Sequence, residues 1–248
     1  MKRLFDLVLS FILLLLFSPI LIVLMILVWK SDFNSPFYIA KRMAKNHGTF
    51  NMIKFRSMIV NAAKSGVNSS SSDDSRITSV GKYLRKYKLD ELPQLLNVFL
   101  GDMSFVGPRP QVKSETDLYT EVEKEILSIR PGITDIASIV FSDEGDILRG
   151  SVDPDLTYNQ IIRPWKSRLA LMYIQKSSFL LDIKILFLTF LTLLDRKKVL
   201  LIIENLLRDW DSDPRMINIV KRDSKLYPYP PPGATEVVSS YPGIKINL

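Results

Sequence analysis

LVLSFILLLLFSPILIVLMILVW, residues 7–29, decides the fold, because it sets where the rest of the chain must lie. Its residues are almost all apolar, and Ser18 and Pro19 stand near its centre. As a straight helix it would be about 34 Å long, which is enough to cross the hydrocarbon core of a bilayer. The sequence therefore predicts a membrane segment at residues 1–30.

Pro19 disturbs such a helix near its middle. Proline has no N–H to donate and its ring collides with the preceding turn, so the carbonyl of Leu15 loses its partner. In lipid, such a carbonyl is covered by protein, by a hydroxyl such as that of Ser18, or by a shallower path. Two interpretations remain open: a kinked helix that spans the membrane once, and a re-entrant helix-break-helix that enters and leaves by one face.

The charges beside the apolar segment are basic on both sides. Positive residues mark the cytoplasmic side of a membrane helix, so matched basic flanks fit a re-entrant segment with both ends inside. A cleaved signal peptide fits poorly, because the segment is too long and no small-residue cleavage site follows it. The flanking basic residues are Lys2, Arg3, Lys30, Lys41, Arg42 and Lys45.

The composition predicts one main domain with appendages and an anionic partner. The chain has 248 residues, of which 47% are hydrophobic, and a formal net charge of +7. Nucleic acid, anionic lipid head groups and phosphorylated substrates all suit this charge, and the membrane segment favours the last two. The chain has no cysteine, which excludes disulfides and thiolate metal sites. The single histidine, His47, lies in a polar turn and is expected to be solvated.

Beyond the membrane segment the pattern predicts an α+β fold that is mostly helical. Two β-rich runs around the turn Asn46-His47-Gly48 predict a hairpin over residues 37–58. The serine-rich residues 61–75 predict a mobile loop. Helices are expected over residues 92–100, 114–129, 164–194 and 202–210, with residues 179–194 half-sunk as an interfacial amphipathic helix and residues 227–232 as an extended, proline-rich arm.

Asp90 and Glu91 are the first candidates for chemistry. An acidic residue before a helix is a good N-cap and is favoured by the helix dipole, so the pair has an ordinary structural explanation. Adjacent residues on a helix point about 100° apart, which suits two separate roles such as a nucleophile and a metal ligand or base. A carboxylate can attack a phosphoryl group and form an acyl phosphate, provided that cations surround the phosphates.

Basic side chains near this pair supply such cations. Arg85 lies just before it in sequence. Two prolines hold Arg109 in Gly107-Pro108-Arg109-Pro110, and a preorganised guanidinium loses little entropy when it grips a phosphate. Lys54 and Arg56 alternate on one strand face. The alternative for each is an ordinary solvated side chain.

No P-loop, Gly-x-Gly-x-x-Gly or histidine-rich metal motif is present in the sequence. A divalent metal would therefore use oxygen ligands, here Asp90 and Glu91, together with substrate phosphate. That donor set suits Mg²⁺.

Several ordered motifs together resemble the bacterial sugar transferase family, the monotopic phosphoglycosyl transferases. The resemblance covers about residues 1–195. The matching segments are Lys2-Arg3-Leu4-Phe5-Asp6, Ser18-Pro19, Lys54-Phe55-Arg56-Ser57-Met58, residues 76–85, Leu89-Asp90-Glu91-Leu92-Pro93-Gln94-Leu95, Asn97-Val98, Gly101-Asp102-Met103-Ser104, Val106-Gly107-Pro108-Arg109-Pro110 and Arg130-Pro131-Gly132-Ile133-Thr134.

The resemblance implies a re-entrant membrane helix at 1–30, a compact catalytic domain at 31–198 and a C-terminal extension at 199–248. It implies transfer of a sugar phosphate from a UDP-sugar to undecaprenyl phosphate, with release of UMP, at the bacterial inner membrane and with the active site facing the cytoplasm. By resemblance, Asp90 is the covalent nucleophile and Glu91 assists as a base or by placing Mg²⁺. Phosphate or substrate would be held by Lys54, Arg56, Arg85, Arg109 and Arg130.

The chain departs from the family pattern after Thr134. Many members continue with Gly-x-Ala-Gln-Val-Asn-Gly-Arg, whereas this chain reads Asp135-Ile136-Ala137-Ser138-Ile139. The arginine that often helps to bind the donor nucleotide is missing there. The tail after about Val199 has no counterpart in minimal members, and we expect it to form a homodimer contact or to lie along the membrane.

Two rival functions differ from the enzyme in class. A non-catalytic membrane adaptor would use the basic surface to recruit acidic lipids or partners, and it would be indifferent to Asp90→Asn. A membrane-tethered nucleic-acid binder ranks last, because the basic residues lack a recognisable nucleic-acid motif. For the enzyme, an N-acetylated amino sugar is the expected donor sugar.

Overall fold

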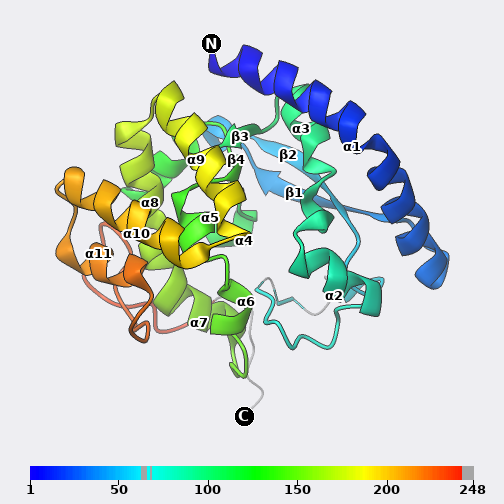
Figure 1. Cartoon of the computed structure of the whole chain (residues 1–248). Helices are drawn as coiled ribbons and strands as arrows, with labels where there is room; N and C mark the ends of the chain where they lie inside the picture. Colours follow the sequence, from blue (N-terminus) through cyan, green and yellow to red (C-terminus); the bar gives the residue numbers. More distant parts are fainter. Residues whose placement is uncertain (63–65, 68, 242–248) are drawn as a thin grey trace.

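The apolar N-terminal segment forms one helix, α1 (Lys2–Asp32), on the outside of the molecule (Figure 1). The computed structural model describes residues 1–62, 66, 67 and 69–241. Pro19 lies inside α1, and the Ser18 hydroxyl donates to the carbonyl of Leu15 at 2.8 Å. The expected interruption at Ser18-Pro19 does not end the helix, because the Ser18 hydroxyl replaces the lost backbone donor. Figure 1 shows α1 as one curved helix.

Both ends of α1 are bound to the same globular body. At its start, Lys2 pairs with Asp182 at 2.7 Å, and Arg3 donates to the carbonyls of Val98 and Phe99. At its end, Asp32 pairs with Arg56 at 2.6 Å. Between these anchors α1 exposes many apolar side chains, and among the described residues it is the helix long and apolar enough to cross a membrane.

The predicted hairpin is confirmed. Strands β1 (Phe37–Met43) and β2 (Thr49–Phe55) pair antiparallel, with Phe37 opposite Phe55. The turn between them is the short 3₁₀ helix η1 (Lys45–His47), in which Asn46 and His47 have positive φ angles. Such angles suit asparagine better than most residues.

The next elements carry the candidate site. Helix α2 (Ser79–Lys86) and the 3₁₀ turn η3 (Leu89–Glu91) lead to α3 (Gln94–Leu100), which confirms the helix predicted at 92–100. Strand β3 (Ser104–Val106) pairs in parallel with β4 (Gly132–Thr134), a second small sheet that the sequence did not predict. Of the serine-rich loop predicted at 61–75, residues 63–65 and 68 lie outside the described residues.

The single helix predicted over residues 114–129 is wrong. The chain instead forms α4 (Lys113–Thr116) and the 3₁₀ helix η4 (Glu123–Ser128). Glu123 accepts the backbone N–H of Thr120 at 3.1 Å and forms a fully buried ion pair with Arg163 at 2.5 Å. The chain turns at Thr120 to bring this carboxylate inward, and that contact outweighs the local helical pattern.

The C-terminal half is helical. Its elements are α5 (Ile136–Val140), α6 (Glu144–Ile147), α7 (Pro154–Thr157), the π-helical turn η5 (Tyr158–Ile162), α8 (Arg163–Lys176), α9 (Phe179–Thr192), α10 (Arg196–Asp209) and α11 (Pro214–Lys221). The helical stretch expected at 164–194 is two helices, because the Ser178 hydroxyl caps a new one. Helix α10 begins six residues before the predicted 202, and α11 was not predicted.

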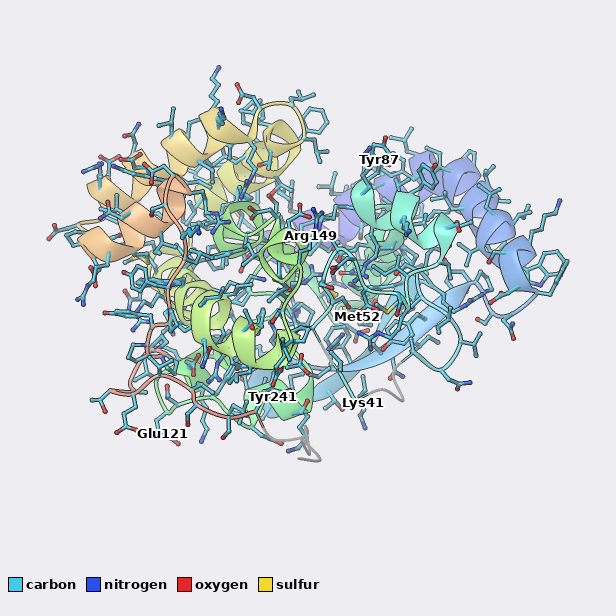
Figure 2. The ribbon with its side chains drawn as sticks, turned by 90° about the horizontal axis from the view of Figure 1, so that it is seen from below. Lys41, Met52, Tyr87, Glu121, Arg149 and Tyr241 are labelled. Carbon is cyan, nitrogen blue, oxygen red and sulfur yellow. The ribbon has the colours of Figure 1, made fainter. Side chains whose placement is uncertain are left out.

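The extension after residue 199 packs on the rest of the molecule. Val199, Ile203 and Leu207 of α10 belong to the same buried cluster as Trp165 of α8. The proline-rich residues 227–232 run along α8, where the ring of Tyr229 stacks on Trp165 at 4.5 Å between centroids. Figure 2 shows the end of the described chain, Tyr241, on the same side of the molecule as Lys41 of β1.

Candidate active site

Asp90 lies in the turn η3, after Lys88 in the left-handed conformation. The residue that precedes α3 as its N-cap is Pro93, and no side chain caps this helix. The ordinary explanation of Asp90 as a helix cap is therefore wrong. Its side chain is nearly buried, and in the part of the chain that the structure describes it makes no hydrogen bond or ion pair. An unengaged carboxylate of this kind keeps its lone pairs available.

Glu91, in contrast, is held by two cations from separate elements. Lys54 on β2 donates to Oε1 at 2.9 Å, and Arg109 donates to both carboxylate oxygens, with Nη1 3.2 Å from Oε2. Burial pushes the pKa of Glu91 upward, but the charges of Arg109 and Lys54 outweigh it, so its pKa lies well below the ordinary value. Glu91 therefore stays ionised and joins the hairpin, the turn and the loop of Arg109.

The loop of Arg109 is fixed by contact between two backbones. Gly107 donates to the carbonyl of Thr134, and Gly132 donates to the carbonyl of Pro108, both at 3.0 Å. A Cβ atom on Gly132 would lie 2.1 Å from the nitrogen of Gly107, so only glycine allows this approach. The two glycines hold the Arg109 loop against β4, and the prolines beside Arg109 fix the direction in which it leaves.

The pKa values of the two adjacent carboxyl groups are driven apart. Burial raises the pKa of Asp90 and the charge of Glu91 raises it further, while Lys54, Arg85 and Arg109 oppose the shift. The pKa of Lys54 is lowered, chiefly by burial and in part by repulsion from Arg109, although Glu91 opposes this. Neighbouring carboxyl groups whose pKa values shift in opposite directions are typical of functional sites, because the surroundings give each group a different charge state and role.

Next to Glu91 lies a cavity of about 560 Å³ whose wall includes the two cations that Glu91 holds. Lys54, Arg85, Asp90 and Arg109 all contribute to its wall. Within the described ranges, Nη1 of Arg85 is buried without a hydrogen-bond partner. Buried polar groups are normally paired, so an unpaired guanidinium N–H in a cavity wall indicates an anionic ligand. The cavity combines an unengaged carboxylate with several cations.

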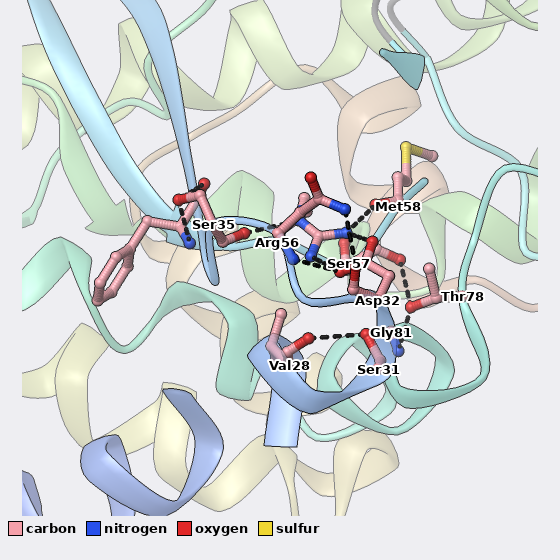
Figure 3. A network of polar contacts seen from close by, with 11 residues as sticks. Val28, Ser31, Asp32, Ser35, Arg56, Ser57, Met58, Thr78 and Gly81 are labelled. Carbon is pink, nitrogen blue, oxygen red and sulfur yellow. Dashed lines mark hydrogen bonds and ion pairs between the residues drawn. The ribbon is translucent and has the colours of Figure 1, made fainter. Parts of the chain in front are cut away.

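Two of the predicted phosphate-binding residues, Arg56 and Arg130, do not present a free guanidinium to the cavity beside Asp90. Arg56 also lines the cavity, but its guanidinium donates to both oxygens of Asp32 and to the carbonyl of Ser35, which ties it to the end of α1 (Figure 3). Arg130 does not line this cavity, and it directly precedes the Pro131-Gly132 contact with the Arg109 loop. The structure therefore gathers Lys54, Arg85, Asp90, Glu91 and Arg109, and leaves Arg130 apart.

Sequence reasoning missed further charged residues of the wall. Arg42 on β1 lies on the same sheet face as Lys54, because Tyr38 is opposite Lys54 and Arg42 follows Tyr38 by four residues, an even number. The hairpin register set by its turn was the signal that could have found it. Lys166 on α8 pairs with Glu144 on α6 at another part of the wall. No local pattern connects these two distant helices.

The carboxylates of Asp90 and Glu91 could hold a hard cation such as Mg²⁺ only if a bound ligand supplied further oxygen atoms. No group of three or more histidine, cysteine, aspartate or glutamate side chains that could hold a metal ion is found among residues 1–62, 66, 67 and 69–241. Asp90 offers free carboxylate oxygens, whereas Glu91 is already engaged by Lys54 and Arg109. Mg²⁺ usually takes one or two carboxylates and completes its shell with water and substrate phosphates, and this site agrees with that pattern.

An exposed apolar helix is thus fixed at both ends to a body whose cavity is lined by a carboxylate and several cations. A model of the family described as bacterial sugar transferase matches residues 1–196. The chain belongs to the bacterial sugar transferase family. At the place where it departs from the usual pattern, the Asp135 side chain caps α5 through the N–H of Ser138 at 2.6 Å.

Individual relatives agree with this assignment. Exopolysaccharide production protein ExoY of Sinorhizobium fredii is 40% identical over 153 residues, covering 56% of this chain and 68% of that protein. The UDP-N-acetylgalactosamine-undecaprenyl-phosphate N-acetylgalactosaminephosphotransferase of Aeromonas hydrophila is 33% identical over 172 residues, covering 66% and 40%. The UDP-glucose:undecaprenyl-phosphate glucose-1-phosphate transferase of Klebsiella pneumoniae is 35% identical over 192 residues, covering 76% and 39%. The chain thus spans about two fifths of the length of the last two relatives.

Asp90→Asn is expected to stabilise the protein at neutral pH. Since the pKa of Asp90 is higher in the folded chain than in the unfolded chain, its ionisation costs folding free energy as pH rises above the ordinary value of 3.8. Thermal unfolding of the detergent-solubilised protein should show a higher midpoint for the variant at pH 7, with the gain vanishing near pH 4. The exposed Asp209→Asn is the matched control. A lower midpoint for Asp90→Asn at pH 7 would contradict the account.

Proposed function

We propose that the protein transfers a sugar phosphate from a UDP-sugar to undecaprenyl phosphate through a covalent intermediate on Asp90, and so initiates assembly of a surface glycan. The observation that carries this proposal is the unengaged, nearly buried Asp90 carboxylate in a cavity lined by Lys54, Arg85 and Arg109. A carboxylate surrounded by cations can attack an electrophilic phosphorus whose oxygens those cations neutralise.

In the first step a carboxylate oxygen of Asp90 attacks the phosphorus that carries the sugar. An acyl-phosphate bond forms, the bond between the two phosphates breaks, and UMP leaves with the electron pair. Arg85 and Arg109, which line the cavity, would offset the charge that develops on the phosphate oxygens. The raised pKa of Asp90 makes its carboxylate a better nucleophile than an exposed one, provided that the pH is high enough to ionise it.

In the second step a phosphate oxygen of undecaprenyl phosphate attacks the same phosphorus. The bond from phosphorus to Asp90 breaks, which restores the carboxylate and leaves the sugar diphosphate on the lipid. Such a two-step route suits a soluble donor and a membrane-bound acceptor, since the two need not occupy the cavity together.

Glu91 supports this chemistry by holding the cations that bind the phosphates. Its ion pairs with Lys54 and Arg109 keep both side chains at the cavity wall. A carboxylate with a strongly lowered pKa is a weak base, so this geometry favours a positioning role over the alternative of a general base. Mg²⁺, held by Asp90 with donor phosphate oxygens and with Glu91 near at hand, would supply further neutralisation of the diphosphate.

The identity of the sugar rests on the relatives alone. One acts on UDP-N-acetylgalactosamine and another on UDP-glucose, as their names state. An N-acetylated amino sugar is our expectation for this chain. The glycan would be an O-antigen, capsule, exopolysaccharide or glycoprotein glycan, and the name of the Sinorhizobium relative agrees with exopolysaccharide production.

We further propose that α1 is re-entrant in the bacterial inner membrane, with the active site facing the cytoplasm. Two observations support this path. Lys2, Arg3 and Asp32, at opposite ends of α1, bind one globular body, and α1, which contains Pro19, is curved (Figure 1). Apolar side chains of α9, among them Phe187 and Phe190, are also exposed and suit contact with the membrane interface.

The reaction is tested by UMP release from a panel of UDP-sugars with undecaprenyl phosphate and Mg²⁺. The wild type is expected to release UMP from at least one donor, and Asp90→Asn is expected to lose at least about a thousandfold in rate because the nucleophile is gone. Asp209→Asn should retain full activity. Equal activity of the wild type and Asp90→Asn would overturn the proposed role of Asp90.

The adaptor hypothesis gives the opposite pattern in a second assay. Binding to vesicles that contain anionic lipid would be unaffected by Asp90→Asn and weakened by joint changes at the exposed Lys82 and Lys86 of α2. A folded protein that shows this pattern and releases no UMP from any donor would favour the adaptor.

The membrane path is tested with single cysteines, since the natural chain has none. We expect a cysteine inserted after Met1, Lys30→Cys and the control Lys124→Cys to react with an impermeant thiol reagent in inverted membrane vesicles and to be protected in intact cells. If the cysteine after Met1 reacts from outside intact cells while the control does not, α1 spans the membrane and the re-entrant path is wrong.

A further inference from the structure

Three residues of the cavity wall have buried polar atoms without a hydrogen-bond partner in the described part of the chain. The atoms are Nε of Arg42, Nη1 of Arg85 and Oε1 of Glu115. Native structures leave few such atoms unpaired, because each one costs free energy. Their common position in one cavity indicates that a ligand pairs them.

The three atoms require different chemistry from that ligand. The guanidinium groups of Arg42 and Arg85 suit phosphate oxygens. The carboxylate of Glu115 does not suit phosphate oxygens, because both groups are negatively charged and repel each other. Glu115 must therefore face a part of the ligand that carries O–H or N–H groups.

Glu115 does not form an ion pair with Arg163, the buried arginine nearby. Arg163, whose charge acts on Glu115, directs its guanidinium to Glu123, Asn159 and the carbonyl of Leu118 instead. Burial raises the pKa of Glu115, and hydrogen bonding by Tyr241 and Asn159 opposes the shift. No salt bridge accounts for Glu115 within the ranges that the structure describes.

The carboxyl group is nevertheless held in a fixed direction. Glu115 lies on α4 and is only 4% exposed. The side-chain amide of Asn159, in the π-helical turn η5, donates to its Oε2 at 3.4 Å. Tyr241, near the end of the described chain, hydrogen-bonds the carboxyl group as well. Asn159 thus holds Oε2, and Oε1 is the carboxyl oxygen that has no hydrogen-bond partner among the described residues.

We propose that Glu115 is a donor-recognition residue, whose Oε1 accepts a hydrogen bond from a hydroxyl or N–H group in the uncharged part of a nucleotide sugar. This inference rests on the proposed function, since the cations around Asp90 hold the diphosphate of the same molecule. The hydrogen-bond donor belongs either to the transferred sugar or to the nucleoside, and both offer the required chemistry.

The test measures binding of the active UDP-sugar and of UDP to the full-length detergent-solubilised protein by calorimetry. Glu115→Gln keeps the shape of the side chain and should weaken UDP-sugar binding by about 10- to 100-fold, since a charge-assisted hydrogen bond is lost. Loss for UDP-sugar alone places the contact on the sugar, and equal loss for UDP places it on the nucleoside. Glu125→Gln, an exposed glutamate on η4, is the matched control and should bind both ligands normally.

The outcomes separate this inference from the proposed function. A wild type that binds neither UDP nor any UDP-sugar contradicts the proposed function. A wild type that binds, together with a Glu115→Gln protein of unchanged unfolding midpoint and unchanged affinity for both ligands, overturns the role of Glu115 alone. The KM for the donor should rise in Glu115→Gln and kcat should fall by a smaller factor, with an unchanged unfolding midpoint. A merely structural role would instead lower the unfolding midpoint.

Discussion

The ion pairs of Glu91 with Lys54 and Arg109 are the constraint on which the site depends. They join β2, the turn η3 and the loop after β3, three elements that are far apart in sequence. Removing one partner from such a mostly buried arrangement would leave a charge unpaired, which typically costs about 3–5 kcal/mol. Among the described residues, the adjacent Asp90 makes no hydrogen bond or ion pair, so one carboxylate holds the cations, and we propose that the other reacts.

The sequence predicted the elements that local chemistry determines. The hairpin follows from Asn46 and His47, which tolerate positive φ angles, and α3 follows from its apolar spacing. Asp90, Glu91, Lys54, Arg85 and Arg109 were all recognised as candidates, and the structure brings them together. The family resemblance predicts that these residues lie close together in the fold. Their positions in the sequence do not predict this, because contacts between distant segments are set by tertiary packing.

Other features could not be predicted because they depend on long-range contacts. The helix expected at 114–129 is broken where Glu123 turns inward to Arg163, a partner 40 residues away. Arg56 looked like a phosphate ligand on its strand, yet Asp32 at the end of α1 takes its guanidinium. The pairing of β3 with β4 needs the close approach of Gly107 and Gly132, which neither segment indicates alone.

A covalent phospho-sugar on Asp90 is the step on which the proposed reaction depends. The most direct measurement is the intact mass of the protein after incubation with its UDP-sugar and Mg²⁺ in the absence of undecaprenyl phosphate, followed by peptide mapping. We expect a mass increase of one sugar phosphate, located on Asp90 and lost when undecaprenyl phosphate is added, with no increase in Asp90→Asn. Release of UMP that requires undecaprenyl phosphate, with no adduct at any time, would contradict it.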